Sequence, residues 1–311
     1  MSHVPGVPRW AVELTKGTSI SRRIGLDIDK LAPGENALPA IEVVIRTGVD
    51  AALVSVMLDG VGDWTVRLLE VAVEQMIGLS IEPLRGSTFD QPARLWNFLP
   101  GICTPIGDGL DRYRVFNVAR HRAFAKWFGD GAIAQGQVPP ASCIGHAGLG
   151  IAIHAMGVRI GVVPVENPRQ VSAFAYSPKF GPRPPCFARA GLTIIGGRPI
   201  LMVAGTASVV GEGSAHEGSL EAQLRETMMN LQAVIAEAQR VGEGTITAGR
   251  ADFTRVLATR VYYRRREDRA ALERMLPTEL MDPAEVEFVH AEICRNELLI
   301  EIEVLAEMAS A

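Results

Sequence analysis

The sequence predicts an α+β protein built from three similar units. Its C-terminal third has the order β-β-α-β-α-β-β, which places helices on one face of a sheet. Parts of that order recur in the middle and at the start of the chain. Three such units of about a hundred residues each predict packing with pseudo-threefold symmetry. The expected divisions are residues 1–88, 89–190 and 191–311.

The C-terminal unit has the clearest pattern. Apolar runs at residues 192–195 and 199–204, joined by a Gly-Gly-Arg turn, predict a hairpin. Apolar residues then recur at helical spacing over residues 220–238, with Ser219 as the expected N-cap and Gly242 as the expected end. Three more elements complete the unit: a strand at 256–262, a helix at 268–276, and a closing hairpin of 288–293 with 298–306.

The first two units are expected to repeat parts of this order. Apolar runs at 41–45 and 51–57 precede a predicted helix at 64–76. The central unit is expected to hold a short helix at 91–98, a strand at 113–118, a helix at 121–128 and a hairpin of 141–145 with 150–156. Residues 150–154 then align with 299–303. Ala152 takes the place of Glu301 in this alignment, so acid chemistry is expected once per chain.

The closing strand is the strongest chemical signal in the chain. It alternates apolar and acidic residues, so Glu301 and Glu303 share one face. Two neighbouring carboxylates repel each other, and at least one should keep its proton to a higher pH. A carboxylic acid that is protonated at neutral pH is suited to general-acid catalysis. The alternative is an edge strand with one solvated face.

Composition and charge narrow the function classes. The 311 residues are 48% hydrophobic and 21% charged, as in globular proteins. A net charge of −4 with scattered arginines argues against a nucleic-acid partner. The apolar stretch 149–165 is interrupted by glycines and charges, and no signal peptide is visible, so we expect no membrane association. Four separated cysteines without a CxxC pair predict a cytoplasmic protein, and we expect a monomer.

Residues 205–211 (GTASVVG), residues 216–223 (HEGSLEAQ) and the closing strand resemble the YjgF-type reactive-intermediate deaminases. This resemblance covers the C-terminal third only. Those deaminases carry an arginine ahead of the strand glutamate, where it grips a substrate carboxylate. Val286 occupies that position here. The resemblance therefore implies the fold more than the deaminase activity.

A longer part of the chain resembles the chorismatases, which remove pyruvate from chorismate. Matching blocks run in order from about residue 95 to the C-terminus and include LDRYRVFN at 110–117, ENPRQVSA at 166–173, FGPRPP at 180–185 and FARA at 187–190. The resemblance implies three deaminase-like subdomains with pseudo-threefold symmetry. It also implies an active site between the central and C-terminal parts.

Chorismate carries an enol ether and two carboxylates. Protonation of its terminal methylene carbon gives an oxocarbenium ion, after which the C–O bond to the ring can break. The resemblance implies that Glu301 supplies this proton. The carboxylates need cationic or hydroxyl donors. The expected substrate-binding residues are Tyr113, Arg114, Arg120, Arg169, Tyr176, Arg189, Thr206 and Ala207. No metal or organic cofactor is expected.

Two positions bear on the product. Chorismatases that form hydroxybenzoates tend to carry cysteine where this chain has Cys294, which makes that thiol a candidate catalytic residue. Alanine at the position of Ala207 goes instead with hydrolysis to a dihydrodiol. The mixture leaves 3-hydroxybenzoate, 4-hydroxybenzoate and a dihydroxycyclohexadiene carboxylate open. The alternatives are an enamine or imine deaminase, and a non-catalytic metabolite-binding protein on the same scaffold.

Overall fold

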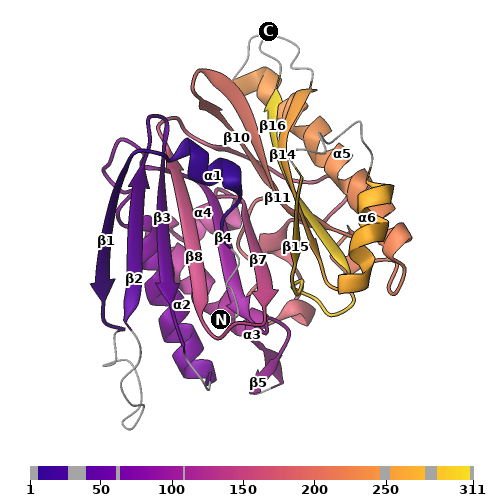
Figure 1. Ribbon diagram of the computed structural model, residues 1–311, viewed down its shortest axis with the longest axis horizontal. Helices are drawn as coiled ribbons and strands as arrows, with labels where there is room; N and C mark the ends of the chain where they lie inside the picture. Colours follow the sequence, from indigo (N-terminus) through magenta and orange to yellow (C-terminus); the bar gives the residue numbers. More distant parts are fainter. Residues whose placement is uncertain are drawn as a thin grey trace.

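A computed structural model describes residues 6–26, 40–60, 64–107, 109–245, 253–276 and 286–308. These residues form two six-stranded sheets with helices packed against them (Figure 1). The predicted α+β class is confirmed. A short helix, α1 (Arg9–Leu14), lies near the N-terminus. None of the helices in these ranges is long and apolar enough to cross a membrane.

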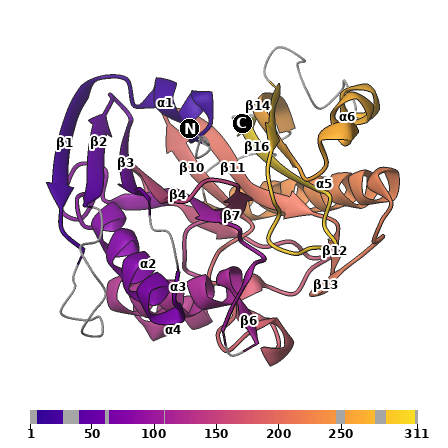
Figure 2. The same ribbon diagram turned by 60° about the horizontal axis from the view of Figure 1, so that its bottom comes forward.

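The first sheet has the order β1-β2-β3-β8-β4-β7. Its strands are β1 (Thr18–Ile24), β2 (Ile41–Thr47), β3 (Ala51–Leu58), β4 (Gln91–Pro100), β7 (Ala141–His146) and β8 (Ile151–Val158). β4 and β7 are parallel, and the other neighbouring pairs are antiparallel. Figure 2 shows α2 (Val66–Ile81) and α3 (Arg112–Phe128) on one side of this sheet, followed by α4 (Asp130–Ala134).

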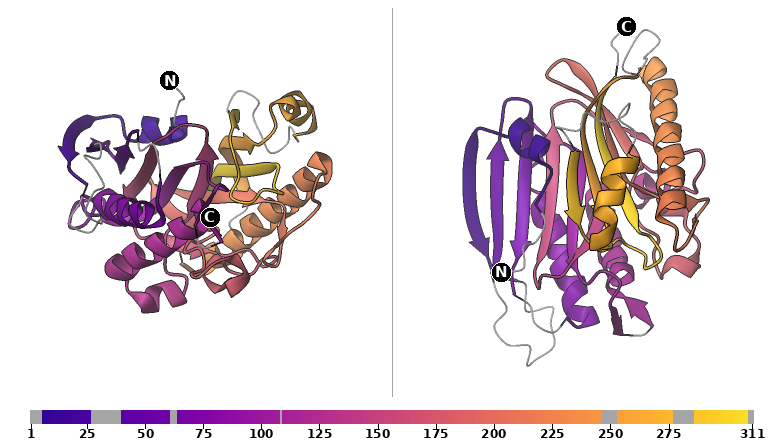
Figure 3. Two further views of the ribbon diagram at one scale, coloured as in Figure 1. Left: turned by 90° about the horizontal axis from the view of Figure 1, so that it is seen from below. Right: turned by 45° about the vertical axis from the view of Figure 1, so that its right-hand side comes forward.

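The second sheet has the order β9-β10-β11-β16-β14-β15. Its strands are β9 (Val163–Val165), β10 (Ala190–Ile195), β11 (Arg198–Ala207), β14 (Phe253–Tyr263), β15 (Val286–His290) and β16 (Ile300–Met308). Figure 3 shows α5 (Leu220–Thr245) and α6 (Arg269–Met275) on its outer side. Two small strand pairs lie outside the sheets: β5 (Pro105–Gly107) with β6 (Leu110–Asp111), and β12 (Val209–Val210) with β13 (Gly213–Ser214).

The two sheets repeat each other strand for strand. β1, β2, β3, β8, β4 and β7 occupy the places of β9, β10, β11, β16, β14 and β15, and each sheet ends in a parallel pair. β8 and β16 match, as the predicted alignment of their segments requires. The described residues thus contain two repeats and do not show the predicted third. Each sheet with its helices forms one unit of the structure: the first unit runs from β1 to β8, and the second from β9 to β16. The division predicted after residue 88 falls inside the first sheet, because β3 pairs with β8.

Several predicted elements are wrong. The helix predicted at 91–98 lies within strand β4, and the strand predicted at 113–118 lies within helix α3. α3 begins earlier than expected because the Asp111 carboxylate caps it, accepting a hydrogen bond from the Arg114 amide at 2.8 Å. Ser219 caps α5 as predicted, with the Ala222 amide 3.3 Å from its hydroxyl. α5 continues to Thr245, past the predicted end at Gly242.

Both the central and the closing hairpin predictions are also wrong. β4 separates β7 from β8, and β14 separates β15 from β16. In the first unit β7 pairs in parallel with β4, and β8 pairs with the opposite edge of β4. In the second unit β15 pairs in parallel with β14, and β16 pairs with the opposite edge of β14. The first C-terminal hairpin, β10 with β11, is confirmed.

The inner faces of the two sheets pack on each other around one apolar cluster. Trp96 and Phe98 come from β4, Met202 from β11 and Tyr262 from β14, and all four are buried. The helices cover separate clusters on the outer faces. This arrangement brings β4 and β7 of the first unit against β16 of the second.

Candidate active site

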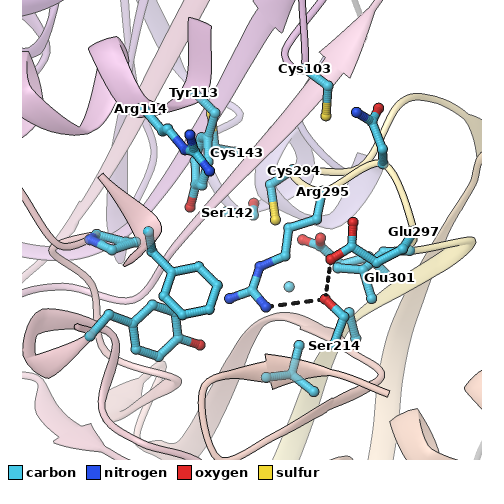
Figure 4. Close-up of a pocket in the computed structure, with 18 of the residues that line it drawn as sticks. Cys103, Tyr113, Arg114, Ser142, Cys143, Ser214, Cys294, Arg295, Glu297 and Glu301 are labelled. Carbon is cyan, nitrogen blue, oxygen red and sulfur yellow. Dashed lines mark hydrogen bonds between the residues drawn. The ribbon is translucent and has the colours of Figure 1, made fainter. Parts of the chain in front are cut away.

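A cavity of about 480 Å³ lies between the two units. β7 and α3 of the first unit supply one wall, and β11 and β16 of the second supply another. Figure 4 shows Ser142, Cys143, Cys294, Arg295 and Glu301 around this space. The resemblance implied an active site between the central and C-terminal parts, and this cavity has that position.

Glu301 lines the cavity from β16, between Ala207 on β11 and Tyr262 on β14. Its carboxyl is buried. Burial, followed by the charge of Glu303, raises the pKa of Glu301 to about 8, although Arg94 and Arg189 act in the opposite direction. A carboxyl with this pKa is mostly protonated at neutral pH. Glu301 thus has the property that a general acid needs.

Gly205, which has no side chain, leaves room for the Glu301 carboxyl. Gly205 on β11 faces Glu301, and a Cβ atom at position 205 would lie 1.7 Å from its Oε1 atom. No side chain fits there unless the carboxyl moves. Gly205 therefore lets the acid occupy its present place. In the sequence, Gly205 stands out only as the first residue of the GTASVVG block.

Glu303 is buried on the same face of β16, as the alternation predicted. Its carboxylate is hydrogen-bonded to residues of the first unit and does not line the cavity. Oε1 accepts hydrogen bonds from Arg94 Nη2, at 2.9 Å, and from the Ser142 hydroxyl. Oε2 accepts one from Trp96 Nε1 at 3.1 Å. These donors come from β4 and β7 and were not among the predicted site residues.

Six predicted substrate-binding residues line the cavity: Tyr113, Arg114, Arg120, Tyr176, Arg189 and Ala207. Arg120 and Arg189 are both buried, with their guanidinium carbons 5.6 and 5.0 Å from the centre of the Phe187 ring. Within the described ranges, the buried Nε of each has no hydrogen-bond partner. Arg189 Nη2 also donates to the Tyr176 hydroxyl at 2.8 Å. Two buried cations with spare donors thus converge on one aromatic ring.

The other two predicted binding residues do not line the cavity. Arg169 donates from Nε to Asn230 Oδ1 at 3.0 Å, and its Nη2 pairs with the buried Glu226 carboxylate. Its guanidinium is therefore occupied by residues of α5, away from the cavity lining. The Thr206 hydroxyl is turned to the Ala204 carbonyl, at 3.1 Å. Neighbouring strand residues face opposite sides, so the side chain of Ala207 lines the cavity and that of Thr206 does not.

Arg295 was not among the predicted site residues. It lines the cavity with its guanidinium carbon 4.3 Å from the Phe180 ring centre. Its Nη1 donates to Ser214 Oγ at 3.1 Å, and the Ser214 hydroxyl donates to Glu297 Oε1 at 2.7 Å (Figure 4). The signal was available, because Arg295 directly follows Cys294, a predicted site residue, in the sequence.

Three thiols also line the cavity, although only Cys294 was predicted. Burial, followed by the charge of Glu301, raises the pKa of Cys294 to about 12. Burial raises the pKa values of Cys103 and Cys143 as well. All three cysteines are free. At neutral pH these groups stay as thiols, which can donate a hydrogen bond or shape the pocket but are poor nucleophiles.

The sequence of this chain is similar to those of known proteins. The family model described as "Chorismatase FkbO/Hyg5-like, N-terminal" matches residues 42–157. The 3-hydroxybenzoate synthase of Streptomyces hygroscopicus is 36% identical over 217 residues, which cover 68% of this chain and 62% of that protein. A chorismatase of Streptomyces rapamycinicus is 36% identical over 214 residues, with the same two shares. The chain thus spans 62% of the length of each of these relatives.

Two solved structures are similar to parts of this chain. The YjgF gene product of E. coli matches 47% of this chain with 18% identity and a TM-score of 0.31. A crystal structure of a chorismatase matches 85% of this chain and 77% of its own, with 29% identity and a TM-score of 0.71. On the family model, the two relatives and the chorismatase structure, this chain is similar to the chorismatases over most of its length.

Proposed function

We propose that the protein removes pyruvate from chorismate, with Glu301 as the general acid. The observation that carries this proposal is the Glu301 carboxyl, which burial keeps protonated at neutral pH in the wall of a cavity. Cationic side chains line the same cavity, as a substrate with two carboxylates requires. The named activities of the relatives, chorismatase and 3-hydroxybenzoate synthase, support the same reaction.

In the proposed reaction, Glu301 gives its proton to the terminal methylene carbon of the enol ether. The resulting oxocarbenium ion weakens the C–O bond to the ring. When this bond breaks, its electron pair stays on the oxygen and pyruvate leaves. The ring is left as a carbocation. Capture by water with loss of a proton gives the dihydrodiol, whereas rearrangement with loss of a ring C–H proton gives an aromatic hydroxybenzoate. In either route the released proton, carried by water, restores the protonated Glu301 at the end of the cycle.

Arg120 and Arg189 are the proposed clamps for the two substrate carboxylates. Both guanidinium groups are buried, so charge-assisted hydrogen bonds formed there are screened little by water. Each has a buried Nε–H with no partner among the residues that the structure describes. Planar guanidinium groups also match the geometry of a carboxylate. Arg295 and Arg114 extend the cationic lining.

The direct test is incubation of the pure protein with chorismate. Pyruvate is measured with a lactate dehydrogenase assay, and the ring product is identified by chromatography against the two hydroxybenzoates and the dihydrodiol. We expect stoichiometric pyruvate and one main ring product. Ammonia release from an enamine substrate without action on chorismate would favour the deaminase alternative. Chorismate binding without turnover would favour the non-catalytic one.

Arg189→Ala should weaken the binding of chorismate. Loss of one charge-assisted hydrogen-bonding group costs about 1.5–3 kcal/mol, which is roughly a 10- to 100-fold rise in KM. Arg169→Ala is the matched control, because that guanidinium is held by Glu226 and Asn230 outside the cavity. We expect Arg169→Ala to lower Tm and leave KM for chorismate near the wild-type value. If steady-state kinetics showed a raised KM for Arg169→Ala and an unchanged KM for the Arg189 variant, the assignment of Arg189 as a carboxylate clamp would be wrong.

Cys294 is proposed to steer the product toward a hydroxybenzoate. A protonated thiol in this cavity can guide a proton or exclude water while the ring rearranges. Cys294→Val removes the thiol at similar volume, and we expect a larger share of dihydrodiol or a slower turnover. Chromatography of both reaction mixtures measures the ratio, with Cys143→Val as the comparison within the same lining. Equal product ratios for wild type and Cys294→Val would reduce Cys294 to a packing role.

We also propose a cytoplasmic protein that acts as a monomer on a small molecule. All four cysteines are free, which supports a reducing compartment. Sedimentation at the protein concentration of the enzyme assay tests the monomer.

A further inference from the structure

A buried ion pair joins the two units next to the cavity. Arg94 lies on β4 of the first unit, and its side chain is 1% exposed. Its Nη2 donates to Glu303 Oε1 at 2.9 Å and to the Ser142 hydroxyl at 3.0 Å. Its Nη1 donates to the Leu95 carbonyl at 2.8 Å. The guanidinium is thus fixed in one orientation by its own unit while it binds a carboxylate of the other.

Glu303 is fixed just as tightly. Its donors, Arg94, Trp96 and Ser142, all belong to the first unit. Glu303 itself lies on β16, two residues beyond Glu301 and on the same face. At Glu303, the next inward-facing position after Glu301, β16 is therefore hydrogen-bonded to β4 and β7. One of these partners, Ser142, also lines the cavity.

Several charged or titratable groups face Glu301 from the surrounding elements: Glu303 on β16, Arg94 on β4, Cys143 on β7, Tyr262 on β14, Arg189 ahead of β10 and Cys294 ahead of β16. Glu303 raises the pKa of Glu301, whereas Arg94 and Arg189 lower it. The two members of the ion pair thus act on the acid with opposite signs.

We propose that Arg94 and Glu303 are positioning residues, whose pairing across the two units holds β16 in place and sets the protonation and location of the Glu301 carboxyl. This inference rests on the proposed role of Glu301. It adds that the acid depends on the first unit, although Glu301 itself belongs to the second. Neither residue of the pair lines the cavity, so both act through Glu301.

Opposite shifts in the pH profile test this inference. The acid works in its protonated form, so kcat/KM is lost as the pH rises through the pKa of Glu301. Glu303→Gln leaves the Arg94 cation facing Glu301, and this midpoint should fall by roughly one pH unit. Arg94→Met leaves the Glu303 carboxylate instead, and the midpoint should rise. Arg94→Lys keeps the cation and should return the midpoint toward the wild-type value.

Arg260→Met is the matched control for these variants. Arg260 is another buried arginine, 3.4 Å from Glu287, and it is not among the groups that shift Glu301. Its loss should leave the midpoint in place. A merely structural role for the Arg94–Glu303 pair would lower activity in both single variants without moving the midpoint. Unmoved midpoints, or shifts in the same direction, would overturn the inference.

A second measurement keeps this inference separate from the proposed function. The protonated carboxyl band of Glu301 can be followed against pH by infrared difference spectroscopy, with Glu301→Gln as the blank. Opposite shifts of that band support the positioning role even if chorismate is not the substrate. If a single variant fails to fold, the uncharged double variant Arg94→Met/Glu303→Gln replaces it, because it leaves no unpaired buried charge. We expect the double variant to turn over chorismate at least tenfold more slowly than the wild type, and a wild-type rate would overturn the inference.

Discussion

Glu301→Gln should lower kcat for pyruvate release by roughly 10²- to 10⁴-fold, the usual contribution of general-acid catalysis. The amide has the shape of the carboxyl but cannot transfer a proton as a carboxylic acid does. KM should change little, because the proposed clamps, Arg120 and Arg189, are untouched. Pyruvate release at the wild-type rate by a folded Glu301→Gln protein would contradict the mechanism.

The same variant should be more stable than wild type at alkaline pH. The pKa of Glu301 is raised to about 8 in the folded protein, so folding is penalised wherever the unfolded chain has already released this proton. The penalty is absent well below the unfolded pKa, grows as the pH rises, and reaches its full size above about pH 8. The uncharged amide of the Glu301→Gln variant carries no such penalty. Tm of both proteins across this range should therefore diverge with rising pH, and equal slopes would show that Glu301 is not perturbed.

The chemistry of β16 could be predicted from the sequence because it depends on a local pattern. A period of two places Glu301 and Glu303 on one face whatever surrounds the strand. Their separate roles could not be predicted, because the partners of Glu303 lie about two hundred residues earlier on β4. Only the packing of the two sheets shows that one carboxylate is neutralised by Arg94 and the other is left to face the cavity.

The errors in the predicted elements have a related cause. Residues 91–98 are almost wholly buried in β4, so neither face shows the alternation that marks a strand. Both mistaken hairpins come from assuming that strands adjacent in sequence also pair. In each unit a parallel pair breaks that rule. Hydrophobic pattern located β10, β11, β14, β15 and β16, but the order of these strands in the sheet depends on long-range pairing.

The repeat also explains why the chain holds one proposed acid. β8 occupies the place of β16, and Ala152 lies in the apolar cluster between the sheets. A carboxyl at that position would be buried among Trp96, Phe98 and their neighbours, with a large desolvation cost. The first unit instead supplies Arg94, Trp96 and Ser142 to the acid-bearing strand of the second. The second unit thus supplies the proposed acid, and the first unit supplies the residues that bind the strand carrying it.

Gly205→Ala should be nearly as damaging as loss of the acid itself. The added Cβ would lie 1.7 Å from Oε1 and 2.6 Å from Cδ of Glu301. These distances are far inside van der Waals contact, so the carboxyl must move by an ångström or more. A displacement of about 1 Å at a reacting group can cost 10²-fold in rate. We therefore expect kcat/KM for chorismate to fall by about two orders of magnitude while the carboxyl is still present.

Gly213→Ala is the control for this variant. Gly213 also lines the cavity, but a Cβ there would come no nearer than 3.9 Å to another group, the Val210 carbonyl oxygen. A methyl group in the lining, by itself, should therefore leave turnover close to the wild-type value. Steady-state kinetics of the two alanine variants, with circular dichroism to establish folding, separates displacement of Glu301 from simple filling of the cavity. Equal activity in both would mean that Glu301 can donate its proton from another position, and the placement of the acid beside Gly205 would then not be essential to the reaction.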